Sequence, residues 1–267
     1  MTEKGPREVI TGRPILKKNA FPSYPPPSRT RIPIGCKWGR KKMGLRGSGA
    51  LIFWHDIREG GESDYEAWHS HEHMRERIGV PGFLRGRRGT ALNNDGPRYL
   101  ILYEVEEASV LTSDPYLARL NDPTPWTLRV VANFINTNRT ISRVSASAGD
   151  GVGSIVLTIR FSPRVGEEIV LRDWLSQNAF PELASTPGLT GVHLLESDVQ
   201  ASETDTAEKK LRDSPDDVAD WVLVVEGYNE ENIKAARDGV LSVDNLSARG
   251  AADSQLVDLF QIVHCVS

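Results

Sequence analysis

The sequence has little cysteine and no long apolar run. Its 267 residues include two cysteines, Cys36 and Cys265, which are too few for a disulfide framework and are typical of a reducing compartment. No apolar run approaches the roughly 20 residues needed to span a bilayer, and residues 1–14 lack the apolar core of a secretory signal. We therefore expect a cytoplasmic protein without a membrane partner.

Motifs for phosphate-binding loops, hydrolase nucleophiles and helical zinc sites are also missing. The chain contains no G-x-G-x-x-G, no G-x-x-x-x-G-K-[ST], no G-x-S-x-G and no H-E-x-x-H. Each of these patterns builds a specific turn or ligand pair that its chemistry requires. We therefore expect no cofactor, and any catalysis would depend on side chains acting on a small-molecule substrate.

Basic residues are scarce outside the first 46 positions. The net charge is −4, but residues 1–46 carry +10 and the remaining residues carry −14. An acidic body disfavours nucleic acid as a partner. The basic stretch contains Pro25-Pro26-Pro27 and shows no hydrophobic periodicity, so we expect residues 1–47 to form a disordered arm. The arm could dock on the acidic body, bind a polyanion or act as a transit peptide, although its prolines disfavour an amphipathic helix.

A regular order of elements begins near residue 49. Apolar runs bounded by turn residues predict strands over 50–54, 83–92, 99–103 and 134–145. A helix is expected to begin at Ser63 or Asp64 and to end before Pro81-Gly82. Residues 108–132 are predicted to be helical at both ends, with an interruption at 122–125.

The same order recurs after a predicted linker at 149–153. Strands are expected over 154–161, 189–196, 221–225 and 256–266, and helices over 169–184 and 230–243. Residues 197–219 are acidic and rich in serine and aspartate, so we expect a mobile loop there.

The two halves share their landmarks at one offset of 106 residues. The pairs are Leu51/Leu157, Phe53/Ile159, Trp68/Trp174, Glu76/Glu182 and Pro81-Gly82/Pro187-Gly188. A period this long indicates a duplicated domain rather than a solenoid. We predict an α+β protein of two tandem ferredoxin-like β-α-β-β-α-β units, over 48–148 and 154–267, whose antiparallel sheets pack face to face as an α/β barrel.

The first helix and the strand after it are similar to a known family. Residues 68–77 are WHSHEHMRER and residues 80–88 are VPGFLRGRR. This pattern resembles the EthD-like branch of the dimeric α/β-barrel superfamily, in which an EH-x-P-E-R element precedes a PGF strand. Residues 99–104 and 116–126 extend the resemblance, which is good over about 49–135 and weaker over 154–266. Arg75 stands where the family often has proline, and Ala179 replaces His73 in the second copy.

The resemblance implies a barrel of two such units, within one chain or in a homodimer, but it does not imply one reaction. Members of the superfamily include cofactor-free monooxygenases, isomerases, cyclases, decarboxylases and haem enzymes. Because one fold hosts many chemistries, the reaction must be argued from the side chains.

His73 is the strongest candidate for acid/base chemistry. Histidine titrates near neutral pH and both takes and gives protons. In this chain it occupies the family's characteristic helix position, which the second copy has lost. The alternative is a partly exposed histidine that packs beside Trp68. His69 shares the helix face of His73 while His71 points elsewhere, and this pair could bind a metal or haem, although such pairs without a zinc motif are more often incidental.

His55 and Asp56 end the first strand and could assist His73. Adjacent strand residues point to opposite faces of a sheet. The register of Leu51, Phe53 and His55 predicts that these three face the helices, which leaves Trp54 and Asp56 on the other face. Asp56 could orient a histidine or act as a base, or it could simply start a turn.

Arg85 and Arg87 lie on one face of the second predicted strand, and Arg88 lies on the other. Two guanidinium groups in a sheet interior would hold a carboxylate or phenolate, whereas on a solvent face they are edge charges. Trp54, Tyr103 and Trp126 would suit an aromatic-lined substrate pocket, although each is more often simple core.

These residues predict a small-molecule enzyme of the first unit, with the second unit closing the barrel over it. The substrate would be a hydrophobic aromatic or polyketide-like acid or phenol, transformed by a lyase, an isomerase or a cofactor-free monooxygenase. His73 would be catalytic with Asp56 or His55, and Arg85 and Arg87 would hold the anion. The alternatives are a non-catalytic ligand-binding or stress-related barrel with His73 turned outward, and a haem or metal barrel that uses His69 and His73.

Overall fold

The structure is a computed structural model that describes residues 44–93, 95–212 and 215–267. These residues lie within one compact unit, so residues 1–43 of the predicted arm fall outside the description. The last residues of the arm belong to the fold, because Leu45 is buried and the Gly44 carbonyl accepts a hydrogen bond from Arg85 Nη2 at 2.7 Å. In the described part of the chain, no helix is long and apolar enough to cross a membrane.

The first half of the fold contains four strands, with helical connections after the first strand and after the third. Its elements are β1 (Gly49–Ile57), α1 (Glu62–Trp68), the π-helical turn η1 (His69–His73), α2 (Met74–Ile78), β2 (Phe83–Ala91), β3 (Tyr99–Val105), the 3-10 turn η2 (Ala108–Thr112), α3 (Asp114–Asn121), α4 (Pro125–Val131) and β4 (Phe134–Ala148). The predicted interruption near residue 123 is a helix boundary. Thr124 caps α4 by accepting from the Thr127 amide, and Pro125 occupies the first turn.

The second half repeats this order of strands and adds two short helical elements between its second and third strands. Its elements are β5 (Ile155–Pro163), α5 (Glu168–Trp174), the π-helical turn η3 (Leu175–Ala179), α6 (Phe180–Ser185), β6 (Leu189–Ser197), α7 (Val199–Ser202), the 3-10 turn η4 (Lys209–Leu211), β7 (Trp221–Gly227), α8 (Glu230–Asp238), α9 (Val243–Ala248) and β8 (Ala251–Val266). The single helix predicted over 230–243 is two helices, because α8 ends at Gly239 and Ser242 caps α9.

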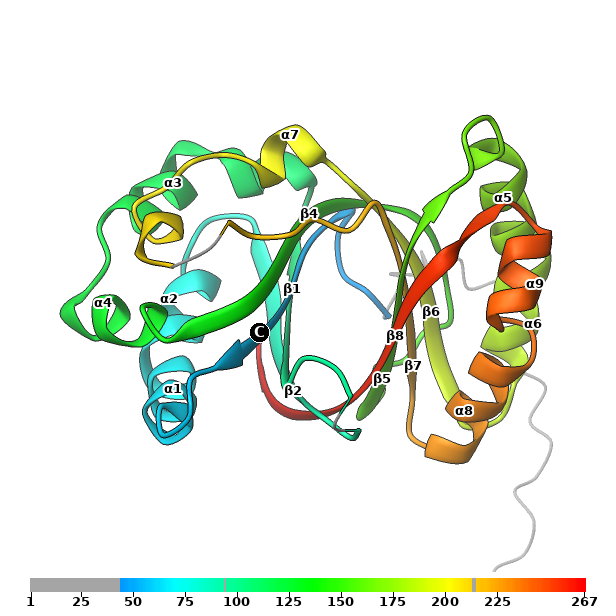
Figure 1. The fold of residues 1–267 in the computed structure, drawn as a ribbon, viewed down its shortest axis with the longest axis horizontal. Coiled ribbons are helices and arrows are strands. Elements are labelled where there is room, and N and C mark those ends of the chain that lie inside the picture. The colour runs from blue at the N-terminus through cyan, green and yellow to red at the C-terminus, as the bar shows by residue number, and fades with distance from the viewer. Residues whose placement is uncertain (1–43, 94, 213–214) are drawn as a thin grey trace, which may run out of the picture. The chain divides into compact units, whose positions relative to one another are not determined.

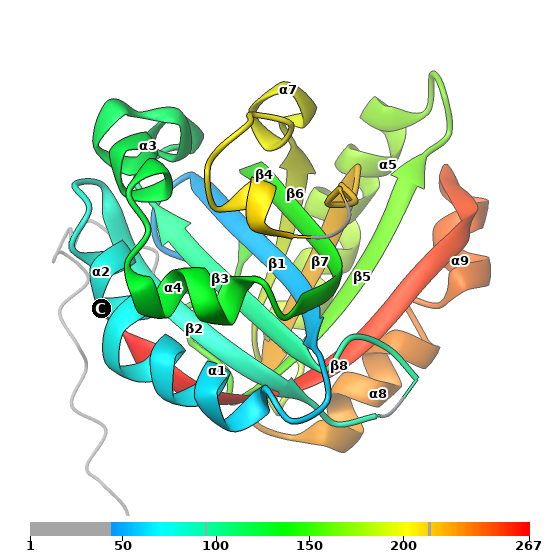
Figure 2. The ribbon, with the colours of Figure 1, turned by 60° about the vertical axis from the view of Figure 1, so that its left-hand side comes forward.

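The strands close into one antiparallel barrel in the order β1-β3-β2-β8-β5-β7-β6-β4. Strands β2 and β8 pair along one seam, and β4 and β6 pair along the other. Helices α1 to α4 cover the outside of the first half, and α5, α6, α8 and α9 cover the second (Figures 1 and 2). The predicted α+β barrel of two ferredoxin-like units is therefore confirmed.

The duplication is exact in register up to the end of β6. Adding 106 to the bounds of β1, α1, η1 and β2 gives the bounds of β5, α5, η3 and β6. Gly82 and Gly188 also correspond, and both adopt a φ of 90° that favours glycine. From β3 to β7 the offset becomes 122, so the second half carries 16 additional residues after β6.

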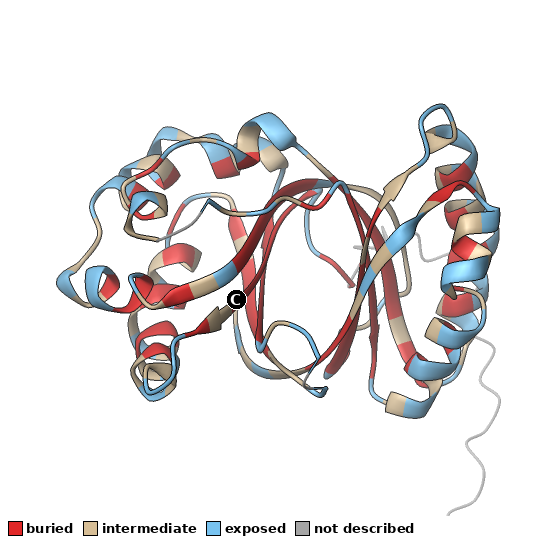
Figure 3. Cartoon of the chain, viewed as in Figure 1, coloured by how far each residue is buried: buried red, intermediate tan, exposed pale blue. Residues whose placement is uncertain are grey.

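Along each strand, alternate side chains point towards the covering helices and into the barrel interior. In β1, Leu51 and Phe53 pack under the helices, whereas Ile52 and Trp54 belong to an apolar cluster inside the barrel. The predicted register is therefore confirmed, and His55 lies on the helix side, stacked against Phe134. The barrel strands consist largely of buried residues (Figure 3).

The segment predicted as a mobile loop instead packs on the first half of the fold. Its N-terminal part hydrogen-bonds to β4, from the Asp198 amide to the Ile141 carbonyl at 2.8 Å and from the Ile141 amide to Ser202 Oγ at 2.9 Å. Its middle part binds α3, because the Ala207 amide donates to Asn121 Oδ1 at 2.9 Å. We call residues 198–212 the cap segment; it is the yellow chain that runs from α7 over α3 in Figure 1.

Candidate functional site

A small cavity of about 30 Å³ lies between the sheet and the helices of the first half. A site of this size has room for about two water molecules. Its lining is aromatic and aliphatic, with a small set of charged and polar groups. The lining residues are Leu51, Phe53, Trp68, His73, Arg77, Ile101, Tyr103, Tyr116, Leu120, Val131, Phe134, Arg139, Glu208 and Arg212.

The π-helical turn η1 sets the direction of the histidines. Its hydrogen bond runs from the Met74 amide to the His69 carbonyl, five residues back. His69 and His73 are both buried, with their ring centroids 5.6 Å apart, while His71 is exposed. Such turns are frequent at functional sites, but here η3 repeats the turn with Leu175 and Ala179 in place of the histidines. The turn is therefore part of the scaffold, and only its side chains distinguish the first half.

His73 faces the cavity with a free ring nitrogen. The ring packs against Trp68 at a centroid distance of 4.1 Å, and Nδ1 is buried without a hydrogen-bond partner among the described residues. Burial, and next the Arg77 guanidinium, hold the pKa of His73 well below its usual range. The imidazole is therefore neutral at pH 7 and can accept a proton.

Tyr103 adds a second free polar group to the cavity. Its hydroxyl is buried and has no partner within the described ranges, and burial raises the pKa of this phenol far above its usual value. Tyr103 therefore stays protonated and can donate a hydrogen bond to an oxygen atom of a ligand. Tyr103 lines the cavity, and its contact with a substrate stays a prediction.

His55 lies in the same helix-side layer but does not line the cavity. Its Nε2 is 3.1 Å from the Tyr65 hydroxyl, and its Nδ1 is 3.3 Å from the Asp56 carbonyl. Burial is the main cause that lowers the pKa of His55 to about 3. Both nitrogens thus have neighbours within the protein, so His55 supports the aromatic layer and does not contact a ligand in the cavity.

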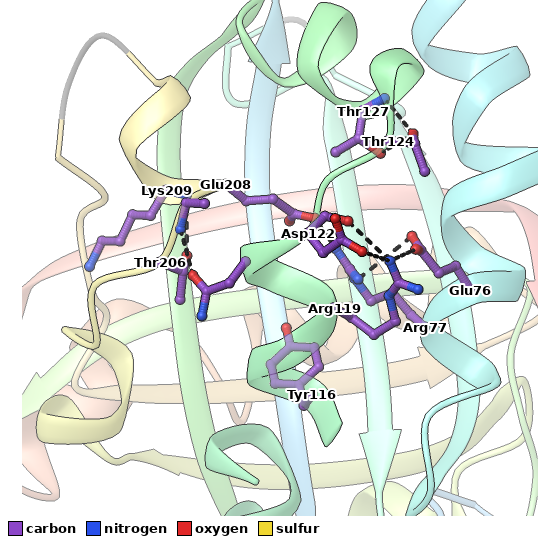
Figure 4. A network of polar contacts seen from close by, with 12 residues as sticks. Glu76, Arg77, Tyr116, Arg119, Asp122, Thr124, Thr127, Thr206, Glu208 and Lys209 are labelled. Carbon is purple, nitrogen blue, oxygen red and sulfur yellow. Dashed lines mark hydrogen bonds and ion pairs between the residues drawn. The ribbon is translucent and has the colours of Figure 1, made fainter. Parts of the chain in front are cut away.

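Charged residues close one side of the cavity. Arg77 on α2 forms a buried ion pair with Glu208 of the cap segment, and Glu76 pairs with Arg119 of α3 at 3.1 Å. Figure 4 shows these groups converging from α2, α3 and the cap segment. The additional residues of the second half therefore supply part of the wall of the site in the first half.

Arg212 supplies another part of that wall. Its guanidinium lies 4.9 Å from the Phe53 ring centroid and 5.9 Å from that of Phe134. The same guanidinium forms an ion pair with Asp216. Arg212 therefore covers the aromatic floor of the cavity while its charge is compensated outside it.

The second half has aliphatic residues at the positions equivalent to four polar residues of the cavity. The offset of 106 matches His73 with Ala179 and Arg77 with Leu183, and the offset of 122 matches Tyr103 with Val225. Arg139 is paired with Phe53 across β1 and β4, and Val257 is paired with the equivalent Ile159 across β5 and β8. All four aliphatic residues belong to or pack on the core of the second half. The fold itself therefore does not require the polar groups of the first half.

Arg85 and Arg87 lie in the sheet interior that we considered for them, but they do not line the cavity. They point into the barrel interior, on the opposite face of the sheet from His73, and their charges are already compensated. Arg85 Nε donates to Glu104 Oε1 at 2.8 Å, and Arg87 Nη1 donates to Glu226 Oε2 at 2.6 Å. These buried pairs leave no guanidinium free for a substrate carboxylate. The carboxylates that these two arginines bind are therefore those of Glu104 and Glu226.

Three further predicted site residues are also away from the cavity. Trp54 is in the barrel interior, where Nε1 donates to Thr158 Oγ1 at 3.1 Å. Asp56 accepts from the Arg98 amide at 2.7 Å and from Asn136 Nδ2 at 2.9 Å, as a turn-binding aspartate does. Trp126 on α4 donates to Asp64 at 2.9 Å. His73 and Tyr103 therefore line the same cavity, whereas Trp54, Asp56 and Trp126 do not line it.

Sequence reasoning missed Arg77, Arg139, Glu208 and Arg212. The repeat could have indicated Arg77, because Leu183 stands at its position in the second copy. Glu208 and Arg212 had no signal, since they reach the site from the other half of the chain. In the part of the chain that the structure describes, no three His, Cys, Asp or Glu side chains are grouped to hold a metal ion.

Comparisons with known proteins show a fold rather than a family. No family model matches the chain, and no curated protein matches it. An anthrone oxidase-like protein is similar in structure, with a TM-score of 0.55 and 13% identity over 82% of this chain and 92% of the other. A protein inferred to be a monooxygenase from Fusobacterium nucleatum has a TM-score of 0.55 and 10% identity, covering 82% and 94%. A similar protein from Lactobacillus acidophilus has a TM-score of 0.53 and 11% identity, covering 82% and 96%. These likenesses support the α/β barrel, while the EthD-like branch stays a prediction.

Proposed function

We propose that this protein is a small-molecule enzyme that works without a nucleotide cofactor, and that His73 is its acid/base residue. One observation carries the proposal. His73 lines the cavity, its Nδ1 is buried with no partner among the described residues, and the second half has aliphatic residues at the positions of His73, Arg77, Tyr103 and Arg139. A non-catalytic barrel would instead have His73 turned outward.

The proposed step is a proton transfer from a phenol or an acidic C–H group to the neutral His73 imidazole. The electron pair stays on the substrate as a delocalised anion, and the Tyr103 hydroxyl donates a hydrogen bond to its oxygen. Return of the proton at another carbon gives an isomerisation, and expulsion of a leaving group gives a lyase reaction. Reaction of the anion with O₂ gives a cofactor-free oxygenation, and the names of the similar structures are those of monooxygenases and an oxidase-like protein.

The cavity volume implies that the site opens before it binds an aromatic substrate. About 30 Å³ is far smaller than a pocket for an aromatic ring system. Glu208 and Arg212 belong to the cap segment, which contacts α2 and α3 through hydrogen bonds and an ion pair and packs Ala201 and Leu211 against the apolar cluster of the first half. Movement of this segment would expose the aromatic rings of Phe53 and Phe134, and its return would exclude water from the reaction.

Anthrone tests the proposal because its C10 protons are acidic and its ring system is aromatic. Under nitrogen in deuterated water, NMR follows exchange of the C10 protons; under oxygen, absorbance follows conversion of anthrone and O₂ to anthraquinone and water. We expect His73→Gln to slow exchange by roughly 100-fold or more. His71→Gln is the matched control, because His71 is exposed on the same turn, and it should retain the wild-type rate. Exchange at the wild-type rate in the folded His73→Gln protein would overturn the role of His73.

A further inference from the structure

Arg139 differs in its partners from other arginines at the core of the protein. Arg77, Arg85 and Arg87 are buried and each is paired with a glutamate. Arg139 is also buried, with 9% of its surface exposed, but no carboxylate lies within ion-pair distance of it among the described residues. Its side chain makes one hydrogen bond, from Nη2 to the neutral Tyr116 hydroxyl at 3.1 Å.

The position of Arg139 on β4 directs it into the cavity. Arg139 stands opposite Phe53 in the register of β1 and β4, so both side chains are on the helix side of the sheet. Both also line the cavity that His73 and Tyr103 line. Arg88 is likewise buried without a carboxylate partner in the described ranges, but it donates to the Glu66 carbonyl and does not line the cavity.

A buried guanidinium without a counter-ion is costly, since arginine stays charged at any ordinary pH. The second half shows that the fold does not need a cation here, because Val257 occupies the equivalent register position. The planar guanidinium also presents paired donors that match the two oxygens of a carboxylate. These properties favour an anionic group of a ligand as the missing partner.

We propose that Arg139 binds the anionic group of the ligand at this site, and that the ligand class is therefore an aromatic carboxylate or phenolate. Its ring would lie on Phe53 and Phe134 under Arg212, and its charged group would replace the counter-ion that Arg139 lacks. The location of the ligand in this cavity rests on the proposed function. The preference of the site for an anionic ligand is measured by binding, without any assay of catalysis.

The test uses 2-naphthoate and 2-naphthamide, which have nearly the same shape and differ in charge. Calorimetry measures both dissociation constants for the wild type, Arg139→Gln and the control Arg143→Gln. Arg143 lies on the same strand but is 63% exposed and paired with Glu196. We expect the wild type to bind naphthoate at least tenfold more tightly than naphthamide. Arg139→Gln should abolish that preference by weakening naphthoate alone, and Arg143→Gln should keep it.

The possible results separate this proposal from the role of His73. A wild type without a preference for naphthoate, including one that binds neither compound, would overturn the role of Arg139, as would an unchanged preference in folded Arg139→Gln. If Arg139→Gln does not fold, Arg139→Lys serves in its place, and retention of the full preference without the paired donors would count against bidentate binding. His73→Gln should keep the naphthoate preference, so a failure of the exchange assay alone would reject only the catalytic proposal.

Discussion

At the scale of single residues, the site is defined by polar groups that the protein leaves without partners. Buried polar atoms are normally hydrogen-bonded, and exceptions often mark a functional role or an absent ligand or water. His73 Nδ1 and the Tyr103 hydroxyl are two such exceptions beside one cavity. Tyr65 is the contrasting case, because its buried hydroxyl is satisfied by His55.

This contrast predicts opposite effects of two tyrosine substitutions. Tyr103→Phe removes a hydroxyl without a protein partner, so the free energy of unfolding should stay the same or rise by up to about 1 kcal/mol. Tyr65→Phe removes the hydrogen-bond partner of His55 and should lower the free energy of unfolding by about 1 kcal/mol. Urea denaturation measures both values. In the anthrone exchange assay, Tyr103→Phe should be slower by about tenfold or more, because the developing oxyanion loses its donor. A marked loss of stability in Tyr103→Phe would show that the hydroxyl is structural.

At the scale of elements, the cap segment connects the halves of the duplication. It follows β6 of the second half, yet its contacts are with β4, α2 and α3 of the first. The buried pair of Arg77 and Glu208 is the most consequential of these contacts, since removal of Glu208 leaves the buried Arg77 with only the more distant Glu76, at 3.7 Å.

Glu208→Gln should therefore release the cap segment. We expect faster amide hydrogen exchange over residues 199–212 and a loss of about 3 kcal/mol in the free energy of unfolding. The matched control is Asp205→Asn in the same segment, because its ion pair with Lys210 is largely exposed and should contribute less than about 1 kcal/mol. Exchange mass spectrometry and urea denaturation give the two readouts. Equal behaviour of the two variants would contradict the role assigned to the buried pair.

At the scale of the whole molecule, the sequence predicted the barrel well and the site only in part. Strand and helix patterns are local, and the shared Trp68/Trp174 and Pro-Gly landmarks revealed the duplication. Side-chain alternation correctly separated His55 from Trp54, but it could not tell which face of the sheet holds a free cavity. Arg85 and Arg87 were assigned to the ligand for this reason, although Glu104 and Glu226 already compensate them. The cap segment was missed because its partners are distant in sequence.

Three buried histidines should make the free energy of unfolding of the whole protein depend on pH below neutrality. The pKa of His55 is lowered to about 3, and those of His69 and His73 are held well below their usual range, in each case mainly by burial. Arg77 and Arg88 add to these shifts by repulsion. Below about pH 6.5, the unfolded chain therefore binds protons at these histidines that the folded chain does not bind.

Stability should accordingly be greatest above pH 6.5 and should fall as the pH is lowered from 6.5 towards 5. Each buried histidine contributes a slope of up to about 1.4 kcal/mol per pH unit, so the three together approach about 4 kcal/mol per unit. Urea denaturation at half-unit intervals measures the slope. His73→Gln should reduce it by about one third, because one titrating group is removed, whereas the exposed His71→Gln should leave it nearly unchanged. A slope that His73→Gln does not alter would mean that the pKa of His73 is the same in the folded and unfolded chains, which would contradict the lowered pKa that its burial produces.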